Sequence, residues 1–528
     1  MICIDCHTVE SSVLRNQCRE YIVKLIVSYG AKRVALFLSP SCAIGKLKLP
    51  RVLNPDDTVL THEAKELKSF IQRVGYIFRH AFIMSDSKCP VSPPSLVRGM
   101  TILDRSAFKA SMEVPGLPVP VKSISDFNKK FKASLCKITK LKPIVLLPES
   151  DDLHKTHRLF LLDPNLYKTL NDFSSRQQDM LKEIGVDIKS FRLYPLELGY
   201  DNWNVTEIME AVLPEGTSNI SGFSTIGHIA HLNLKPEVLK YKHLIGQVVM
   251  DKNTVVKTVV NKLNMIDNTF RNFQMELLAG EENYITRVKE NGLTFEFDFS
   301  KVYWNPRLGT EHARIVDSLG CKDVLYDVFA GVGPFSVPAA KKCVTVLAND
   351  LNSHSYESLQ KNVILNKVKG SIECYNLDGR EFIKTVVKDH LCKTWKECVE
   401  NETKRNIVFT MNLPALAVEF LDSFVGLLAD VEDNDFIDSE WVTMPKVHCY
   451  SFSKSDDPKK DVTDRVVAVL SSGILHGLNI RRVRNVAPNK DMLCATFTLN
   501  RDVLLDQQHQ VLHEGPPAKQ LKMEKAAV

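Results

Sequence analysis

Apolar runs of strand length alternate with helical patterns between residues 306 and 500. The runs predict strands at 323–327, 344–348, 371–377, 407–411 and 447–452. Apolar residues at helical spacing predict helices at 353–365, 415–428 and 463–477, and one that begins at Pro334. Two last runs, near 479–486 and 491–499, predict an antiparallel hairpin. This alternation predicts an α/β domain with an open, largely parallel sheet that binds ligands at the carboxyl ends of its strands.

The chain ahead of residue 306 has a mixed pattern, which predicts an α+β organisation. Residues 85–122 are rich in Ser and Pro and predict a linker or loop. Strand patterns occur at 142–148, 225–234 and 284–303, and helical patterns at 177–184 and 255–266. Charged stretches at 390–404 and 431–440 predict surface insertions. The predicted parts are an extension at 1–99, domains at 100–199, 200–305 and 306–500, and a disordered tail at 501–528.

Bulk composition excludes some classes of protein. A chain of 528 residues is too long for a single core, and no run of eighteen apolar residues is present, so we expect no membrane span. The thirteen cysteines form no framework, and Cys3–Cys6 is the only C-x-x-C pair. We therefore predict reduced thiols and no metal site. The absence of heptads favours a monomer.

Charge is unevenly distributed although the net charge is only +5. Seven lysines lie between Lys122 and Lys142 against one acid, Asp126, with Phe127 and Phe131 interleaved. This segment is either a solvated helix face with two core-facing rings or a surface that contacts phosphates. Residues 1–51 carry eight Lys or Arg against three acids, which is typical of a mitochondrial transit peptide or of a poorly structured extension.

Polar residues and glycines follow the predicted strands. Gly331 and Gly333 lie in a loop from Asp327 to Phe335, where the backbone can approach an anionic or nucleotide ligand. Asp350 ends the next strand, where it can accept hydrogen bonds from ribose hydroxyls. Asp378, beside Gly379, can accept from an adenine amino group, and Asn412 ends the fourth strand. A dinucleotide-dependent oxidoreductase is disfavoured because Ser336 interrupts G-x-G-x-x-G.

These residues occur in motifs that resemble the eukaryotic and archaeal tRNA (guanine-37 N1) methyltransferases. The resemblance covers roughly residues 200–500, and its motifs are 227–233, 270–272, 301–315, 327–335, 349–352, 378–380, 411–414 and 448–450. It implies a Rossmann-like class I methyltransferase domain preceded by α+β RNA-binding or accessory domains, with residues 100–199 recognising tRNA. The cofactor it implies is S-adenosylmethionine.

The resemblance also implies roles for individual residues. Guanine N1 carries a proton, so transfer needs a base at N1 and a donor at O6. Glu311 corresponds to the base and Arg271 to the O6 donor, while Asn412 and Pro414 hold the base edge and Tyr303 orders the site. The cofactor pocket would comprise His312, Asp327, Phe329, Ala330, Gly331, Gly333, Asp350, Leu351, Asp378, Gly379 and Asn412.

Read without the resemblance, Glu311 could simply complement the dipole of a helix, and Arg271 could form a surface salt bridge. Other methyl acceptors are disfavoured: Asn412-Leu-Pro lacks the aromatic residue typical of exocyclic-amine methyltransferases, and Cys449 is not placed for covalent attack on cytosine.

The resemblance predicts methylation of N1 of guanosine 37 in the anticodon loop of cytoplasmic and mitochondrial tRNAs. This modification would support reading-frame maintenance and begin wybutosine synthesis in tRNA-Phe. The expected partner is tRNA, through its anticodon stem-loop and body, and the expected location is the cytoplasm and nucleus with a mitochondrial matrix pool. The alternatives are a wybutosine-pathway aminocarboxypropyl transferase with the same cofactor, and a catalytically silent RNA-binding protein.

Overall fold

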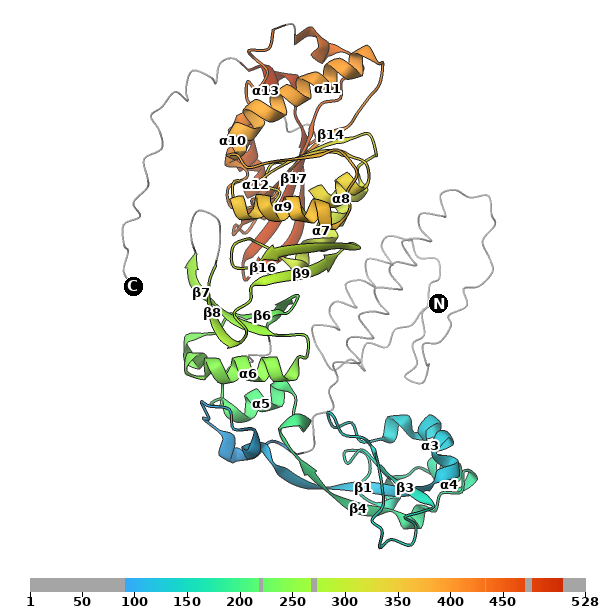
Figure 1. Cartoon of the computed structure of the whole chain (residues 1–528). Helices are drawn as coiled ribbons and strands as arrows, with labels where there is room; N and C mark the ends of the chain where they lie inside the picture. Colours follow the sequence, from blue (N-terminus) through green and yellow to red (C-terminus); the bar gives the residue numbers. More distant parts are fainter. Residues whose placement is uncertain (1–90, 218–221, 267–272, 433, 471–476, 507–528) are drawn as a thin grey trace, which may run out of the picture. The chain divides into compact units, whose positions relative to one another are not determined.

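The computed structural model describes residues 91–217, 222–266, 273–432, 434–470 and 477–506 (Figure 1). The predicted transit peptide, the Cys3–Cys6 pair, Arg271 and residues 507–528 of the predicted tail lie outside the described residues. The prediction of disorder was wrong for the start of the tail, because Arg501–Leu505 form a helix that buries Val503 and Leu504. The chain divides into two units, residues 1–87 and 88–528, and the second unit is described below. Within the described residues, no helix is both long and apolar enough to cross a membrane.

The first part of the described chain is a four-stranded sheet in the order β2-β3-β1-β4. Its elements are β1 (Ala110–Pro120), α3 (Ile124–Phe131), β2 (Ile144–Val145), β3 (His157–Leu161), α4 (Ser175–Glu183) and β4 (Arg192–Leu198). The predicted helix at 177–184 is confirmed as α4. The predicted strand at 142–148 is confirmed only as the short β2. In α3, Phe127 and Phe131 are buried, whereas all seven lysines of the Lys122–Lys142 segment are exposed.

The prediction of a loop over residues 85–122 was wrong for β1, which is a central strand with three prolines. Its first half, up to Gly116, pairs with β4, and its second half pairs with β3. Each half therefore has a strand neighbour along only one side, and a residue without an N–H group is tolerated on the other side. At Pro115 that other side is still partly used, because the Pro115 carbonyl group accepts from the amide of Leu162 at 2.7 Å. Pro115 lies in the first half, and Pro118 and Pro120 lie in the second.

The next part is a four-stranded sheet in the order β5-β6-β7-β8 with two helices. Its elements are α5 (Val205–Val212), β5 (Ser224–Ile226), β6 (Ile229–Leu232), α6 (Lys242–Lys252), β7 (Thr258–Ile266) and β8 (Phe273–Gly280). The β pattern at 225–234 is confirmed as the β5–β6 pair. The predicted helix at 255–266 was wrong, because most of it forms β7. A register shift at Val259 and Val260 accompanies the burial of both side chains, so the alternation typical of a strand is lost.

The last part contains a hairpin and a seven-stranded sheet in the order β13-β12-β11-β14-β15-β17-β16. Its strands are β9 (Ile285–Glu290), β10 (Leu293–Asp298), β11 (Val324–Asp327), β12 (Thr345–Asn349), β13 (Ile372–Tyr375), β14 (Ile407–Met411), β15 (Lys446–Ser453), β16 (Asn479–Ala487) and β17 (Lys490–Thr498). Strands β11 to β15 are parallel, and β16 and β17 are antiparallel. The predicted α/β sheet and final hairpin are confirmed. The strand order reverses at β11, which pairs with β12 on one side and β14 on the other, and such reversal points are where open α/β sheets bind ligands.

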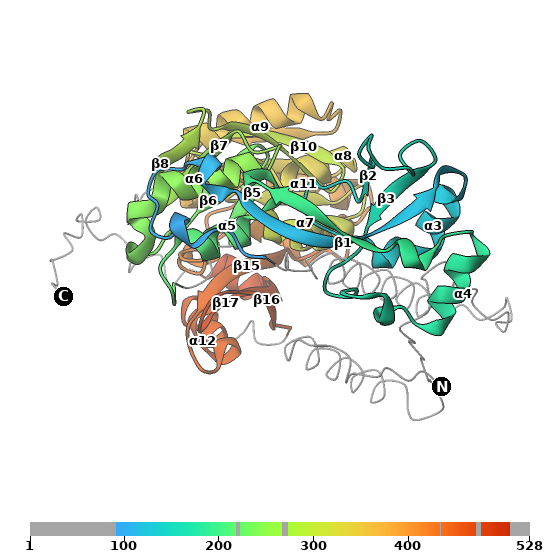
Figure 2. The same ribbon diagram turned by 90° about the horizontal axis from the view of Figure 1, so that it is seen from below.

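Helices cover both faces of this sheet, so its central strands are buried on both sides. The helices are α7 (Gly309–Asp317), α8 (Ser336–Lys341), α9 (Ser353–Leu365), α10 (Gly379–Phe382), α11 (Lys388–Glu400), α12 (Pro458–Leu470) and α13 (Arg501–Leu505). Within β11, Val324 and Tyr326 pack into the core that includes Trp395 of α11, while Leu325 packs into the core formed with α7, α8 and α9. Figure 2 shows α12 beside β15, β16 and β17.

Four predictions in this part were wrong or shifted. The charged stretch at 390–404 is not an insertion, because α11 buries Leu391, Trp395 and Cys398 along one face. Within 431–440, a 3-10 helix at Asn434–Asp438 likewise buries Ile437. The helix expected to begin at Pro334 begins at Ser336, and α12 begins earlier than the predicted residue 463.

The helix predicted at 415–428 is replaced by turns around a 3-10 helix at Glu419–Phe424. The amide groups of Gly426 and Leu428 donate to the carbonyl groups of Val503 and Leu504, at 2.8 Å each. These amides are therefore used by the C-terminal α13 segment instead of by a continuing α-helix.

Candidate active site

The loop between β11 and α8 has two glycines with positive φ. Gly331 (φ +56°) donates its N–H to Asp350 Oδ2 at 2.8 Å, and a Cβ built on it would meet nothing within 4 Å. A Cβ on Gly333 (φ +94°) would lie 2.6 Å from Leu359 and 2.7 Å from Val337. The first glycine thus leaves open space beside the loop, and the second lets the loop pack closely on α8 and α9.

The polar residues predicted at the strand ends lie around this loop. Asp350 follows β12 and accepts from the amide of Asn352 at 2.9 Å, and its burial raises the pKa of its carboxyl group. Leu351 next to it is exposed. Asp378 caps α10 by accepting from the amide of Arg380 at 2.9 Å. Gly379 is buried and packs against the ring of Phe329, so closely that a Cβ added to Gly379 would lie 3.0 Å from a ring carbon.

Asn349 is a structural residue of this site that the sequence analysis missed. Its buried side chain donates to the carbonyl groups of Val328 (3.2 Å) and Leu377 (3.0 Å) and accepts from the amide of Leu377 (2.9 Å). It therefore ties together the ends of β11, β12 and β13. Its position at the end of a predicted strand was the available signal.

The side chain of Asp327 is buried beneath the loop and is not accessible to a ligand. It is completely buried, and its two oxygens accept from the hydroxyl groups of Ser336 (2.5 Å) and Thr410 (2.9 Å). Burial raises its pKa to about 6. The side chain of Asp327 therefore positions the loop and does not line the cofactor pocket predicted for this residue, while a contact through its backbone stays a prediction. Ala330 is buried, and its amide donates to the carbonyl group of Asn349 at 2.8 Å.

Two polar atoms near the loop are buried without a hydrogen-bond partner among the described residues: Nε2 of His312 and Oδ1 of Asn412. The His312 ring packs on Phe335 at 4.7 Å, and its Nδ1 donates to Glu290 at 2.6 Å. Asn412 comes directly after the last residue of β14. Thr410, two residues earlier, is the β-sheet partner of Asp327 at the end of β11, so Asn412 lies beside the loop that follows β11. Both atoms could contact a bound ligand.

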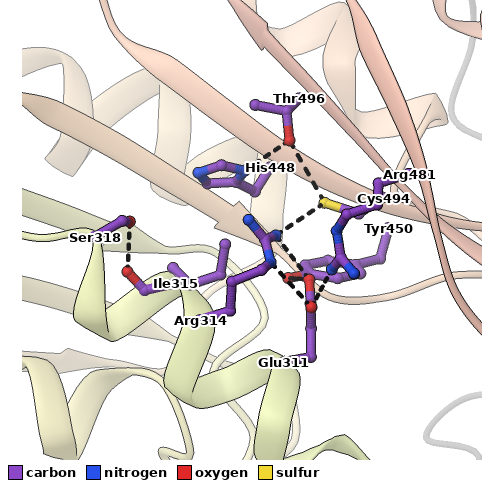
Figure 3. Close-up of polar contacts among 9 residues, drawn as sticks. All are labelled: Glu311, Arg314, Ile315, Ser318, His448, Tyr450, Arg481, Cys494 and Thr496. Atoms are coloured by element: carbon purple, nitrogen blue, oxygen red, sulfur yellow. Dashed lines mark hydrogen bonds and ion pairs between the residues drawn. The ribbon is translucent and has the colours of Figure 1, made fainter. Parts of the chain in front are cut away.

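The carboxylate of Glu311 is buried, and the side chains of Arg314, Tyr450 and Arg481 point toward it (Figure 3). Arg314 donates to both of its oxygens, at 3.0 and 2.8 Å, Tyr450 donates to Oε1 at 2.8 Å, and Arg481 donates to Oε2. The Tyr450 ring lies 6.1 Å from that of Phe335, which connects the acid to the glycine loop. The three donors were not predicted as site residues, although two lie in the quoted motifs 301–315 and 448–450.

Two other predicted residues lie at the edge of this region. Tyr303 is exposed, and its hydroxyl group accepts from Asn305 at 3.2 Å. Pro414 is buried, and its carbonyl group accepts from the amide of Phe452 at 2.9 Å, so it links the end of β14 to β15.

Comparison with known proteins gives two family matches. Residues 286–437 match the TRM5/TYW2 methyltransferase domain, and residues 205–283 match the TYW2 N-terminal domain. The tRNA (guanine(37)-N(1))-methyltransferase of Xenopus tropicalis is 49% identical over 416 residues, which cover 79% of this chain and 82% of that protein. The chain belongs to the tRNA (guanine(37)-N(1))-methyltransferase family.

Further relatives agree with membership of this methyltransferase family. The human tRNA (guanine(37)-N(1))-methyltransferase is 46% identical over 437 residues, which cover 82% of this chain and 83% of that protein. The solved complex of aTrm5 and tRNALeu matches 74% of this chain and 100% of that chain, with a TM-score of 0.50 and 24% identity. This structural likeness shows the fold, and the match at 286–437 includes the β9–β10 hairpin together with strands β11 to β14 of the sheet.

Proposed function

We propose that this methyltransferase transfers the methyl group of S-adenosylmethionine to N1 of guanosine 37 in tRNA. The relatives named for this reaction support it. The structural observation that carries the proposal is the buried carboxylate of Glu311, which is connected through Tyr450 and Phe335 to a loop suited to a nucleotide.

The residues present fit S-adenosylmethionine. The space beside Gly331 admits a ligand close to the backbone, and Asp350 offers a carboxylate for ribose hydroxyl groups. Asp378 and Gly379 suit the adenine, and the buried atoms without partners on His312 and Asn412 suit the polar part of the molecule. When bound, S-adenosylmethionine supplies an electrophilic methyl group.

The protein's own task in this reaction is to take the proton from guanine N1 and to hold the base. Glu311 is the proposed proton acceptor, because N1 becomes nucleophilic only when its proton leaves. Negative charge then builds at O6, and the family resemblance assigns its stabilisation to Arg271. Asn412 and Pro414 at the end of β14 are proposed to hold the base edge, and Tyr303 to order the entrance.

The test is positional mass spectrometry of nucleosides from tRNA incubated with the protein and S-adenosylmethionine, together with single-turnover rates. Glu311→Gln should slow methyl transfer by about 10²-fold or more while tRNA and cofactor still bind, which is the scale of general-base catalysis. Asp317→Asn, an exposed acid on the same helix, is the matched control and should react at the normal rate. Near-normal turnover by Glu311→Gln would remove Glu311 from its role.

A second candidate is aminocarboxypropyl transfer from the same cofactor, because residues 205–283 match a TYW2 N-terminal domain. S-adenosylmethionine labelled either in its methyl group or in its carboxyl group separates the two reactions. Only methyl transfer leaves the methyl label on tRNA, and only the alternative leaves the carboxyl label.

We further propose that residues 100–199 contact the tRNA body and that the protein acts as a monomer. The seven exposed lysines of the Lys122–Lys142 segment support the first of these proposals. The basic, amphipathic pattern of residues 1–51 supports a mitochondrial matrix pool beside the cytoplasmic and nuclear ones. Imaging of the full chain and of a variant that starts at Met100 would test the location.

A further inference from the structure

Glu311 is held by three side chains from three different elements (Figure 3). Arg314 lies on α7 with Glu311 itself, Tyr450 on β15 and Arg481 on β16. Together they donate four hydrogen bonds to the two carboxylate oxygens. This arrangement leaves little room for the carboxylate to accept a fifth hydrogen from a substrate.

The same contacts make Glu311 a weak base. Burial by itself would raise the pKa of Glu311. The hydrogen bonds that Arg314, Arg481 and Tyr450 donate to the carboxylate outweigh this effect and lower the pKa to about 2. The charged and titratable groups that face the carboxylate are Arg314, Tyr450, Arg481, Cys494 and His448. General-base catalysis works best when the pKa of the base is near the working pH, so the carboxylate must lose a partner before it can act.

Arg481 is the partner best placed to leave. Arg314 lies three residues from Glu311 on the same helix and makes two hydrogen bonds to it, and Tyr450 is completely buried. The Arg481 side chain is about as exposed as that of Arg314 (41% and 38%), but it makes one hydrogen bond to Glu311 and lies on β16, at the edge of the sheet. Its Nε–H is buried without a hydrogen-bond partner in the described part of the chain, so this guanidinium still has a donor to offer.

The shape of β16 adds positive charge at the same place. A register shift between Arg482 and Arg484 interrupts the alternation of the strand. As a result, Arg481 and Arg484 lie on the same face of β16. Arg481 contacts Glu311 on α7, and Arg484 contacts Asn305, shortly before α7, at 3.5 Å. Burial lowers the pKa of the Arg484 guanidinium, and the positive charge of nearby Arg307 lowers it further. An anionic backbone would be attracted to these arginines.

We propose that Arg481 is a positioning residue that holds Glu311 inactive at rest and moves to a phosphate oxygen of the bound tRNA, thereby releasing the carboxylate. The inference rests on the proposed function, because it takes Glu311 as the base for guanine N1. In the step that follows, the N1–H bond breaks, N1 keeps the electron pair, and the proton forms an O–H bond with Glu311. Substrate binding itself thus activates the base.

The test compares two pH profiles of the unmodified protein between pH 4 and 8. The profile of kcat/KM reports the free enzyme, and the single-turnover rate at saturating tRNA reports the bound complex. Because the pKa of Glu311 in the free enzyme is about 2, we expect the kcat/KM profile to stay level down to pH 4. Losing a nearby opposite charge raises the pKa of a carboxyl group by about one to three units, so the bound complex should show an acid limb that begins between about pH 4 and 5. Coinciding profiles would overturn the proposal without any variant.

Variants of Arg481 provide the second arm. Arg481→Gln should raise the acid limb of the kcat/KM profile toward that of the bound complex and reduce the salt dependence of tRNA binding by about one phosphate contact. Arg481→Lys should restore part of both effects. Arg482→Gln is the matched control. Arg482 is next to Arg481 in the sequence, but its guanidinium pairs with Asp491 at 2.7 Å and not with Glu311.

The outcomes separate this inference from the function on which it rests. Unchanged pH profiles and unchanged salt dependence in Arg481→Gln, with Glu311→Gln inactive, would overturn the role of Arg481 alone. Normal turnover by Glu311→Gln would instead remove the assigned base. Thermal unfolding with and without S-adenosylmethionine shows whether each variant is folded.

Discussion

The two glycines of the loop between β11 and α8 give a prediction in which one substitution mainly lowers stability and the other mainly lowers ligand binding. Replacing Gly333 with Ala forces a residue with a side chain to φ +94° and places its Cβ 2.6 Å from Leu359 and 2.7 Å from Val337. The left-handed backbone costs about 1–2 kcal/mol, and overpacking adds about 1–3 kcal/mol. We therefore expect Gly333→Ala to lower the free energy of unfolding by about 2–5 kcal/mol.

Gly331→Ala is the matched comparison, because its φ of +56° is also left-handed but its Cβ would meet nothing within 4 Å. It should lose only about 1–2 kcal/mol of stability. Its methyl group would instead enter the space proposed for the cofactor, so its affinity for S-adenosylmethionine should fall by about tenfold or more, or about 1.4 kcal/mol.

Urea unfolding followed by circular dichroism and calorimetric titration with S-adenosylmethionine measure the two effects. Equal stability losses in Gly331→Ala and Gly333→Ala would refute the packing argument. Undiminished cofactor affinity in Gly331→Ala would show that the ligand does not lie over this glycine.

Three further predictions concern the core, the side chain that supports the loop, and the lysines of the Lys122–Lys142 segment. Trp395→Ala should cost about 3–5 kcal/mol because the ring is fully buried, whereas the exposed Lys393→Ala on the same helix should be near neutral in thermal unfolding. Asp327 has a pKa of about 6 in the folded protein against a usual 3.8, so the folded state binds this proton more tightly and the contribution of Asp327 to stability falls as the pH rises from 4 to 6. In unfolding measurements at several pH values, the free energy of unfolding of Asp327→Asn should rise by up to about 3 kcal/mol relative to that of the wild type between pH 4 and 6. A difference between the two proteins that does not change with pH would contradict the raised pKa of Asp327. Changing both Lys129 and Lys132 to Glu should weaken tRNA binding and flatten its salt dependence in filter-binding titrations, and unchanged affinity at low and moderate salt would show that this surface does not contact phosphates.

The parallel sheet could be predicted from the sequence because its strands are short apolar runs that end in polar residues. The predicted bounds of α9 and β14 agree with the structure at both ends. Elements whose local pattern conflicts with their tertiary surroundings could not be predicted. The prolines of β1 conceal a strand that changes partners at Gly116, and in α11 the charges of the outer face conceal the buried Trp395.

The candidate site shows the same division between local and long-range information. Asp350, Asp378 and Asn412 could be predicted because a strand end is a local feature. The contacts of Glu311 could not, because Tyr450 is 139 residues away along the chain and Arg481 is 170 residues away. Only the pairing of β15, β17 and β16 brings these side chains to α7.

The partner exchange of β1 has a consequence for synthesis on the ribosome. The strand emerges early, but Ala110 pairs with Leu198 and Pro118 pairs with Leu159, so neither half can dock when it first appears. Trp203, which lies after β4, donates its indole N–H to the carbonyl group of Phe108, just before β1, so the start of β1 has a second contact with residues near 200. Pairings this distant delay folding and leave strand edges open in the meantime. The second half of β1 therefore stays unpaired until β3 has left the exit tunnel, and the first half until residues near 200 have left it. The three prolines of β1 reduce the risk that the strand aggregates with another chain in the meantime.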